Sequence, residues 1–377
     1  MQKRILLAPN SFKECADSVT VASYFTEELD NINFCKNILL PLSDGGDGFL
    51  EVCNKYYNLE VLQYEISTPY DMSTFQCKVG YNKLKEIMYV ESADVLGLKI
   101  IPPDKRHPLL LSSKGLGDLF KYILQDVEDG KLKVRKIIIG IGGTGTNDLG
   151  LGVLEPFGLK LMDKSGNILN LIPTEFQFAC ALAWSKLDLP FEIEMICDVN
   201  NPLLGFNGAT YEFGMQKGLT ADELEIAENG FANIVKILEK NNMAELSKDL
   251  PGAGGGLAAG LKMFVNAKIK SAKEFISEII NLNNMESVDL IITGEGAFDN
   301  QSLNQKAVGY LINKFSKFDK PIIVCCGKFD SKISTQLPEK VFVIELRKFF
   351  RNEKESIKYF RKGIHLAVKE IAERFLN

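Results

Sequence analysis

The feature that most constrains this chain is a short apolar segment that recurs six times and always ends in glycine, aspartate or asparagine. Each segment is rich in isoleucine, leucine or valine without polar alternation, which is typical of strands buried on both faces of a parallel sheet. The segments are RILLAPNSFK (4–13), NILLPLSDGGDG (37–48), KIIIGIGGTGTND (136–148), IEMICDVNNPLLG (193–205), DLIITGEGAFD (289–299) and PIIVCCGKFD (321–330). They predict buried strands, each followed by a polar loop.

Helical patterns lie between these strand candidates. Apolar residues recur every three or four positions within 116–127, 224–238 and 357–375, which predicts helices with one core-facing side. Strands that alternate with helices indicate an α/β fold. Residues 59–91 differ, because apolar and polar residues alternate there on either side of a short turn at 82–85. We therefore expect a largely parallel sheet with an antiparallel portion.

The length of the chain and the distribution of its patterns predict two domains. With 377 residues the chain is long enough to bury two cores. The C-terminal strand-loop segments resemble the N-terminal ones, whereas the middle of the chain carries its own glycine-rich loops. We therefore expect residues 1–90 and 285–377 to form one Rossmann-like α/β domain, with residues 91–284 as a second α/β domain inserted into it.

Composition excludes several classes of function. A net charge of −5 gives no basic field for nucleic acid or an anionic membrane. The apolar part of the N-terminus is too short for a signal peptide, and no apolar run approaches the roughly 18 residues of a membrane span. The eight cysteines show no zinc or disulfide spacing, and two histidines are too few for a histidine-rich metal site. These observations favour a cytoplasmic protein that acts on small molecules.

The loop GIGGTGTND (140–148) carries the clearest ligand-binding pattern. Gly140, Gly142 and Gly145 fit the G-x-G-x-x-G pattern of dinucleotide-binding loops, and Asp163 follows at about the distance of the ribose-binding acid. Glycines let backbone N–H groups approach an anion, and a helix beginning near Thr146 would point its positive end at phosphate. Glycine is also common in ordinary turns. The pattern therefore leaves open a dinucleotide, the phosphates of another ligand, or no ligand.

Acidic side chains follow several of the other strand candidates. Asp44 and Asp47 lie on SDGGDG (43–48), where they suit substrate hydroxyl groups or a hydrated Mg²⁺. Asp198 comes directly after a buried strand, a common place for a catalytic base, and Glu295 and Asp299 follow another. Because ligands bind beyond the carboxyl ends of strands in open α/β sheets, these loops are candidates for the site.

A second glycine-rich stretch and three lysines complete the candidates. PGAGGG (251–256) precedes a helical pattern, so it suits either a phosphate-binding nest or close helix packing. Lys13, Lys217 and Lys306 each lie beside one of the polar loops and have the charge to neutralise phosphate. For each lysine, a solvated surface position is the simpler alternative.

Together these loops resemble those of the bacterial glycerate kinases. YVESADVLGL (89–98) and HPLLLSSKGLGDL (107–119) match the family, and the resemblance extends from about residue 3 to about residue 327. The other matching stretches, in the order and spacing of the family, are APNSFK (8–13), SDGGDG (43–48), GIGGTGTND (140–148), CDVNNPLLG (197–205), FGMQKG (213–218), PGAGGG (251–256) and TGEGAFDNQS (293–302). The resemblance favours a kinase phosphate loop over a dinucleotide loop.

The resemblance implies ATP-dependent phosphorylation of D-glycerate, with 2-phosphoglycerate as the usual product in this branch and Mg²⁺ as a cofactor. It also implies two α/β domains, one inserted in the other, with the active site in the interdomain cleft. Asp198 is then the expected catalytic base, with Asp44 as the rival, and Lys13 meets the carboxylate or the moving phosphoryl group. A homodimer is compatible with this family but is not indicated by any motif.

The remaining roles follow from the same resemblance. The nucleotide phosphates are expected at Gly142, Gly143, Thr144, Gly145, Thr146, Asn147, Gly254, Gly255 and Lys217. The acid is expected at Ser11, Gly45, Gly46, Asp47 and Lys306. Glu295 and Asp299 are expected to reach Mg²⁺ directly or through water.

The chain departs from the family pattern at four positions. Asn10 and Ala297 stand where the family has aspartate and arginine, and Leu149 and Gln305 stand where it has glycine. Loss of an arginine near an anionic group removes a bidentate clamp. The departures keep open a kinase of another small hydroxy acid and a degenerate protein that binds nucleotide or acid without turnover. A nicotinamide-dependent dehydrogenase is a further alternative, but it leaves the acidic loops without a role.

Overall fold

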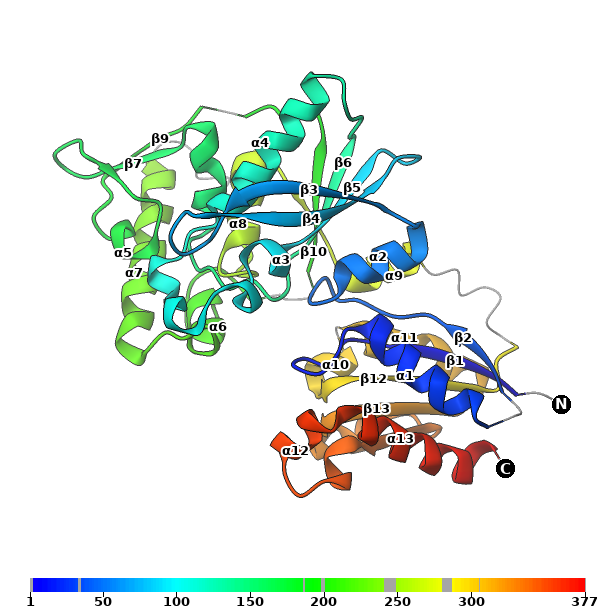
Figure 1. Ribbon diagram of the computed structural model, residues 1–377. Coiled ribbons are helices and arrows are strands. Elements are labelled where there is room, and N and C mark those ends of the chain that lie inside the picture. Colours follow the sequence, from blue (N-terminus) through cyan, green and yellow to red (C-terminus); the bar gives the residue numbers. More distant parts are fainter. Residues whose placement is uncertain are drawn as a thin grey trace. The chain divides into compact units, whose positions relative to one another are not determined.

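The computed structural model describes residues 3–32, 35–185, 187–197, 201–240, 249–279, 287–304 and 306–376 (Figure 1). The chain divides into two compact units. Unit 1 consists of Met1–Tyr56 and Ser271–Asn377, and unit 2 consists of Tyr57–Lys270. One unit is therefore inserted in the sequence of the other.

Unit 1 is built on a five-stranded parallel sheet. Its strands are β1 (Lys3–Pro9), β2 (Cys35–Leu39), β12 (Leu290–Phe298), β13 (Ile322–Phe329) and β14 (Val341–Glu345), in the order β14-β13-β12-β1-β2. Counted along unit 1, this order is 2-1-3-4-5, the doubly wound order whose direction reverses between its first and third strands. The carboxyl ends of β1 and β12 therefore border the place where such sheets bind ligands.

Helices cover both faces of this sheet. The side chains of Ile5 and Leu7 in β1 pack in a core with helices α1 (Ser18–Asp30) and α13 (Phe360–Ile371). Leu6 and Ala8 point the other way, into a core with α9 (Ala272–Ile279) and α11 (Ala307–Phe315). The remaining α-helices described in unit 1 are α2 (Phe49–Tyr57, whose last residue begins unit 2), α10 (Asn300–Asn304) and α12 (Glu353–Lys358). Strands buried on both faces, as predicted from the apolar runs, are confirmed here.

Unit 2 contains a mixed six-stranded sheet. Its order is β11 (Lys268–Lys270), β10 (Glu192–Ile196), β6 (Lys136–Gly140), β5 (Ile87–Glu91), β4 (Thr74–Asn82) and β3 (Glu60–Ser67). The first four strands of this order are parallel, whereas β4 pairs antiparallel with both β5 and β3. The antiparallel portion expected within 59–91 is therefore confirmed.

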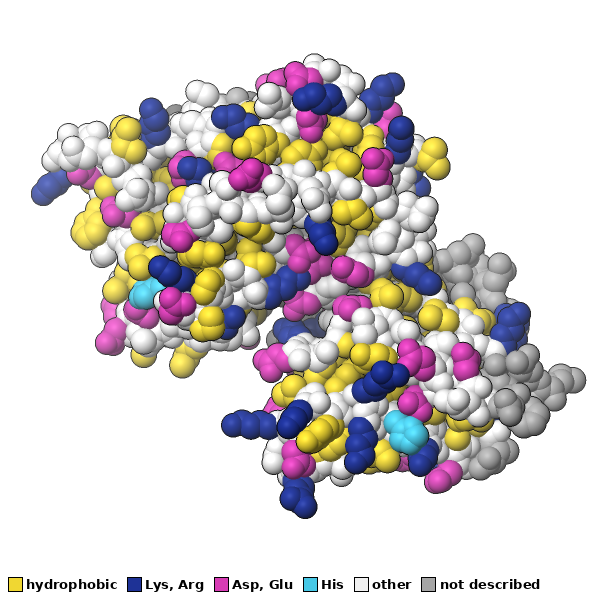
Figure 2. Space-filling model, in the orientation of Figure 1, with side chains coloured by type: hydrophobic (Ala, Val, Ile, Leu, Met, Phe, Trp, Pro, Cys, Tyr) yellow, Lys and Arg dark blue, Asp and Glu magenta, His cyan; other side chains and the backbone are white. Residues whose placement is uncertain are grey.

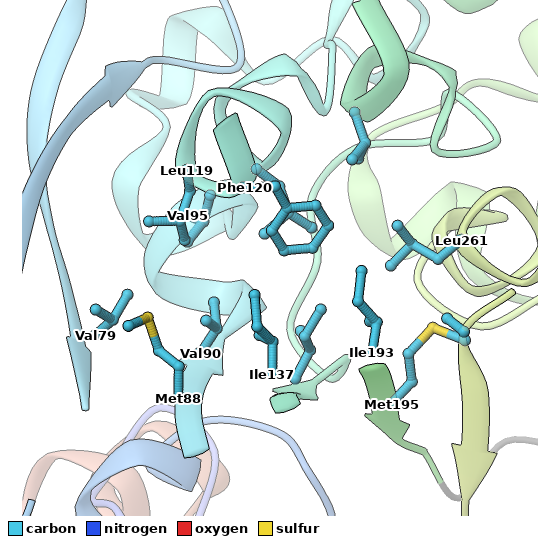
Figure 3. Packing of buried hydrophobic residues seen from close by; sticks show 14 of the residues in the cluster. Val79, Met88, Val90, Val95, Leu119, Phe120, Ile137, Ile193, Met195 and Leu261 are labelled. Carbon is cyan, nitrogen blue, oxygen red and sulfur yellow. The ribbon is translucent and has the colours of Figure 1, made fainter. Parts of the chain in front are cut away.

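The main core of unit 2 lies between this sheet and helices α4 (Lys114–Glu128) and α8 (Leu257–Val265). Figure 3 shows Val90 and Ile137 of the central strands pointing toward Phe120 of α4, while Met195 of β10 lies near Leu261 of α8. All five side chains are completely buried. The helical pattern at 116–127 thus faces the core, as expected.

A second core of unit 2 lies around α7. This helix (Ala221–Lys240) buries Phe231 and Ile234 against Leu149 and Leu154. The other elements of unit 2 are α3 (Ser92–Leu96), α5 (Pro173–Phe176), α6 (Ala209–Lys217) and a small sheet of β8 (Ile168–Leu169), β7 (Lys160–Met162) and β9 (Ala181–Ala183). The two cores hold the polar loops of the unit from different sides.

Two expectations differ from the structure. The units meet in sequence at 56/57 and 270/271, not at 90/91 and 284/285. The reason is pairing: β5 forms a parallel ladder with β6, so the preceding hairpin belongs to the sheet of unit 2. In addition, no helix begins near Thr146: residues 142–150 consist of turns, irregular backbone and an isolated bridge between Thr144 and Gly97, and a 3₁₀ segment follows at Leu151–Phe157.

On the face drawn in Figure 2, lysine and arginine side chains are scattered and do not gather into a continuous basic field. Across the described segments, no helix combines the length and apolar character needed to cross a bilayer.

Candidate functional site

The first candidate site lies at the carboxyl ends of β1, β2 and β12 in unit 1. Asn10 directly follows β1, and its backbone N–H donates to the carbonyl of Gly294 in β12 at 2.8 Å. Asp44 lies on the loop after β2, and Glu295 is the residue after Gly294. Asn10 and Glu295 therefore come from the two strands that flank the reversal of strand order, where ligands are expected, and Asp44 comes from the loop after the neighbouring strand β2.

Asp44 is held by two neighbouring groups. The side-chain amide of Asn10 donates to Asp44 Oδ2 at 2.5 Å, and the backbone N–H of Ala307, the first residue of α11, donates to Oδ1 at 3.0 Å. Asn10 Oδ1 in turn accepts from the backbone N–H of Ser11 at 2.9 Å. Asn10, which departs from the family pattern, is therefore a hydrogen-bonding member of the site.

Glu295 is an acid in a strongly desolvated position. Its side chain is 7% exposed, Oε2 lies 3.9 Å from Lys306 Nζ, and Oε1 is buried without a hydrogen-bond partner in the described part of the chain. Burial, and secondly the charge of Asp44, raise the pKa of Glu295 to about 8, against the opposing charge of Lys306. Burial also raises the pKa of Asp44. The site thus resists holding two negative charges and leaves one buried oxygen available to a ligand.

The other predicted residues of unit 1 lie on the turns around this centre. Lys13 is exposed on a turn closed by reciprocal backbone hydrogen bonds between Phe12 and Ala16, and its charge acts to lower the pKa of Asp44. Asp47 is exposed at the tip of the SDGGDG loop. The two glycines between Asp44 and Asp47 shape that tip: Gly45 N–H donates to Ser43 Oγ at 3.1 Å, and the Gly46 carbonyl accepts from Phe49 N–H at the start of α2.

The acids of unit 1 do not form a cage for a metal ion. Asp299 accepts from the backbone N–H of Ser302 at 2.9 Å and so caps α10. Among the described residues, no group of three or more acidic, histidine or cysteine side chains is arranged to hold a metal. Mg²⁺ in phosphoryl-transfer sites is usually bound by one or two carboxylates together with substrate phosphates. Asp44 and Glu295 fit that smaller protein contribution.

The second candidate site is the glycine loop after β6 in unit 2, residues 140–150. Gly143 is exposed at its apex and Gly142 is half-buried, whereas Thr144 is buried. The hydroxyl of Ser92, at the start of α3, donates to the carbonyl of Gly142 at 3.2 Å and lies 3.0 Å from the hydroxyl of Thr144. Gly145 N–H donates to the carbonyl of Leu96 at 2.8 Å. The apex is therefore open while its base is fixed to α3.

Asp148 anchors the far end of the glycine loop. Its Oδ2 accepts from the backbone N–H and hydroxyl of Ser113 at 2.6 and 2.7 Å and from Gly152 N–H at 3.3 Å, while Oδ1 accepts from Gly150 N–H at 3.2 Å. Burial raises the pKa of Asp148, and these hydrogen bonds oppose that effect. Because Ser113 precedes the first residue of α4, Asp148 ties the loop to the beginning of that helix.

The glycine run before α8 packs directly against the glycine loop. Gly254, Gly255 and Gly256 have φ values of 65°, 67° and 84°, a left-handed backbone that favours glycine. A Cβ atom on Gly255 would lie 2.3 Å from the carbonyl oxygen of Thr146. The helix that follows begins at Leu257, as the sequence predicted.

Within the described segments, several buried polar atoms in this part of unit 2 have no hydrogen-bond partner. They are Thr146 Oγ1, both amide atoms of Asn147, and Thr210 Oγ1 on α6. All three side chains are completely buried. Buried polar groups in native proteins are nearly always satisfied, and exceptions call for a ligand or water. The loop residues expected to bind phosphate therefore retain unused hydrogen-bonding capacity.

Lys217 lies inside unit 2, where the sequence gave no sign of burial. It is the last residue of α6, it is 6% exposed, and its ammonium group donates to the carbonyl of Thr146 at 2.7 Å. Burial lowers the pKa of Lys217 to about 7, with the charge of Asp148 acting in the opposite direction. Lys217 thus joins α6 to the glycine loop.

The structure brings together most of the predicted residues within each unit. Asp44, Glu295 and Lys306 meet in unit 1, and in unit 2 the glycine loop meets the glycine run and Lys217. Asp198, the predicted base, and Gln305 lie outside the described residues.

Three residues of the glycine-loop site received no role from the sequence, namely Ser92, Ser113 and Asp148. All three lie in stretches that match the family, and this match was a signal from which they could have been found.

Comparison with known proteins decides the family. The model of the glycerate kinase family matches residues 5–375, which includes both sites. The chain belongs to the glycerate kinase family, a family of phosphotransferases. The family resemblance predicted from the loops is therefore confirmed.

Similar proteins agree with this family. Glycerate 2-kinase of Escherichia coli K12 is 32% identical over 337 residues, covering 88% of this chain and 86% of that protein. Glycerate kinase of Neisseria meningitidis serogroup B is 32% identical over 330 residues, covering 86% and 85%. The crystal structure of a candidate glycerate kinase 2 from Salmonella typhimurium LT2 has a TM-score of 0.71 and 27% identity, covering 99% of this chain and 100% of that one. The similarity thus spans nearly the whole fold.

The buried acid of unit 1 predicts how stability depends on pH. Glu295 titrates near 4.5 when unfolded and near 8 when folded, so between these values the unfolded chain has lost a proton that the folded protein keeps. The contribution of this group to stability is therefore complete below about pH 4.5 and is lost as the pH rises through about 8. We expect Glu295→Gln to raise the unfolding temperature at about pH 9 but not at about pH 5. Thermal unfolding without Mg²⁺ or nucleotide measures this, with the exposed Glu14→Gln as control, and equal pH profiles for Glu295→Gln and the parent would contradict it.

Proposed function

We propose that this protein transfers the terminal phosphoryl group of ATP to a hydroxyl group of D-glycerate, giving 2-phosphoglycerate. The observation that carries the proposal is the family match over residues 5–375, which contains both polar sites. The relatives named glycerate kinase and glycerate 2-kinase support the choice of acid. Phosphoryl transfer requires chiefly that the two substrates are positioned and that the charge of the phosphates is stabilised. The loops of the two sites can position the substrates, and their lysines can stabilise the charge.

In this proposal, the glycine loop and glycine run of unit 2 bind the nucleotide phosphates. The open apex at Gly142 and Gly143 lets phosphate approach the backbone, since no side chain stands in the way. The hydroxyl group of Thr146 and the side-chain amide of Asn147 have no hydrogen-bond partner among the described residues, so both can donate hydrogen bonds to a bound phosphate. Thr144, Gly145, Gly254 and Gly255 shape the surroundings of the apex.

The site in unit 1 binds the acid. Lys13 and Lys306 supply positive charge for the carboxylate or the transferred group, and Ser11 with the SDGGDG loop supplies hydroxyl and backbone groups. Mg²⁺ that arrives with the nucleotide would be held by Glu295 and Asp299, directly or through water, and would neutralise phosphate charge. The buried, unpartnered Oε1 of Glu295 supports this assignment.

The substrate hydroxyl must lose its proton to a base. Asp198 is the proposed base because it comes directly after β10, and Asp44 is the rival. Asp44 already accepts hydrogen bonds on both oxygens, from Asn10 and Ala307. These bonds orient Asp44 well, but they also leave its carboxylate less available as a proton acceptor, which supports the choice of Asp198.

The departures from the family pattern favour an active enzyme over a degenerate one. Asn10 donates to Asp44, which an ionised aspartate at position 10 could not do. Ala297 is exposed and pairs in register with Lys328 of the neighbouring strand β13, while Lys306 lies next to Glu295. Cations therefore remain close to the position of the missing arginine.

The proposal is tested by a coupled ADP-release assay over a panel of small hydroxy acids, with the product identified by ³¹P NMR. We expect D-glycerate to be preferred, with kcat/KM in the usual enzyme range of about 10⁴–10⁸ M⁻¹s⁻¹, and 2-phosphoglycerate to be the product. A preference for another acid would mean that this acid, and not D-glycerate, is the substrate. Nucleotide binding without turnover of any acid would instead indicate a degenerate protein.

The assignment of the base gives a separate prediction. Asp198→Asn should lower kcat by at least about 100-fold, the usual scale for loss of a general base, with little change in ADP affinity. Steady-state kinetics and ADP titration measure the two quantities, with Asp104→Asn as a matched change on an exposed acid outside both sites. If Asp198→Asn keeps kcat within a few-fold of the parent while Asp44→Asn abolishes turnover, Asp44 is the base.

A further inference from the structure

Lys217 occupies an unusual place for a lysine. Its helix, α6, ends at this residue, and Gly218 follows with φ 113°, which turns the chain away and leaves the lysine side chain directed inward. The ammonium group lies between two loops: it donates to Thr146 O, and a Cβ on Gly255 would stand only 2.7 Å from it. The space for the ammonium group therefore exists because residue 255 has no side chain.

The hydrogen-bonding capacity of this ammonium group is only partly used. A lysine has three donors, and the acceptor found within the described segments is the carbonyl of Thr146. Among the described residues, Asp148 is the acid whose charge acts on Lys217, and its carboxylate already accepts hydrogen bonds from Ser113, Gly150 and Gly152. A buried ammonium group without a close carboxylate is costly, so burial lowers the pKa of Lys217 to about 7.

Other charged groups near the end of α6 are already engaged. Arg106, whose carbonyl lies against Gly218, donates its guanidinium hydrogens to the carbonyls of Leu98 and Ile101. His107 lies 3.1 Å from Glu223 of α7. The glycine run contributes no ionisable side chain. Asp148 is therefore the charge to which Lys217 responds in the ligand-free protein.

An anion at the open apex of the glycine loop would change this balance. Gly254, which is partly exposed, is the immediate neighbour of Gly255 and so lies about 3.8 Å away along the backbone. A Cβ on Gly254 would stand 3.4 Å from Thr144 Oγ1, so the run and the loop meet there as well. A phosphate bound where the glycine run meets the glycine loop would favour the charged form of Lys217, because opposite charges attract strongly in a buried region of low dielectric constant.

We propose that binding of a nucleoside diphosphate or triphosphate to the glycine loop is coupled to uptake of one proton by Lys217. The neutral amine of the free protein becomes an ammonium group in the complex, and the proton comes from the buffer. Lys217 then carries a positive charge inside unit 2 only while the negatively charged phosphate is bound. This inference rests on the proposed function, since it takes the glycine loop as the phosphate site.

The coupling has two measurable consequences. At about pH 8, binding of ADP should take up between about half a proton and one proton, whereas at about pH 6 Lys217 is already charged and should contribute almost no uptake. For the same reason, the affinity for ADP should fall up to about tenfold for each pH unit above about 7. The phosphates of ADP are fully ionised at pH 8 and so do not mask the effect.

Isothermal titration calorimetry of the full chain with ADP, in two buffers of different ionisation enthalpy, measures this proton uptake. Lys217→Met, which keeps the length of the side chain without its charge, should abolish the uptake, and the exposed Lys121→Met should retain it. Binding by the unmodified protein without uptake at pH 8 would overturn the inference and leave the proposed function standing. Uptake that persists in Lys217→Met would also overturn it, whereas no binding of ADP at all would contradict the proposed function.

If Lys217→Met does not fold, the proton uptake of the unmodified protein still tests the inference. Its uptake at about pH 8, where the phosphates of ADP are already ionised, must reach at least about half a proton, and binding without uptake at that pH would overturn the inference. A purely structural role of Lys217 predicts a loss of stability in the variant but no proton uptake by the parent. The calorimetric readout therefore separates the two roles.

Discussion

The close approach of two backbone segments in unit 2 is the constraint on which the candidate phosphate site depends. The glycine loop and the glycine run can meet only where side chains are missing. A Cβ on Gly255 would lie 2.3 Å from Thr146 O, and one on Gly260, a turn further into α8, would lie 2.2 Å from Leu149 O. Contacts this short allow no side chain, so the glycines fix the separation of loop and helix. That separation in turn creates the buried space for Lys217.

In unit 1, acidic side chains lie close to the place where the strand order of the parallel sheet reverses. Asp44 and Glu295 lie close enough for each to disfavour ionisation of the other, and Lys306 and the amide of Asn10 partly compensate. Desolvation alone would favour neutral carboxyl groups. A cationic ligand or a second lysine contact would favour their charged forms, which suits a site that meets a substrate together with a metal ion. The raised pKa of Glu295 therefore results from its burial and from the charge of Asp44.

Much of the fold was predictable because the strands are buried on both faces. Ile5, Leu6, Leu7 and Ala8 alternate between two cores, and only an unbroken apolar run satisfies both. The domain boundaries were not predictable in this way, because the hairpin of β3 and β4 could extend either sheet and only its pairing through β5 to β6 decides. Likewise, the run of glycines at 254–256 is visible in the sequence and suits a left-handed backbone. The burial of Lys217, in contrast, depends on a contact with Thr146, which lies 71 residues away in the sequence.

The central claim is that each unit binds one substrate, and hydrogen exchange with single ligands tests it most directly. ADP alone should slow exchange of backbone amides within 142–150 and 252–256 of unit 2. D-glycerate alone should slow exchange within 10–13, 43–48 and 294–299 of unit 1. The account would be contradicted if ADP protected the loops of unit 1 and left the glycine loop unchanged.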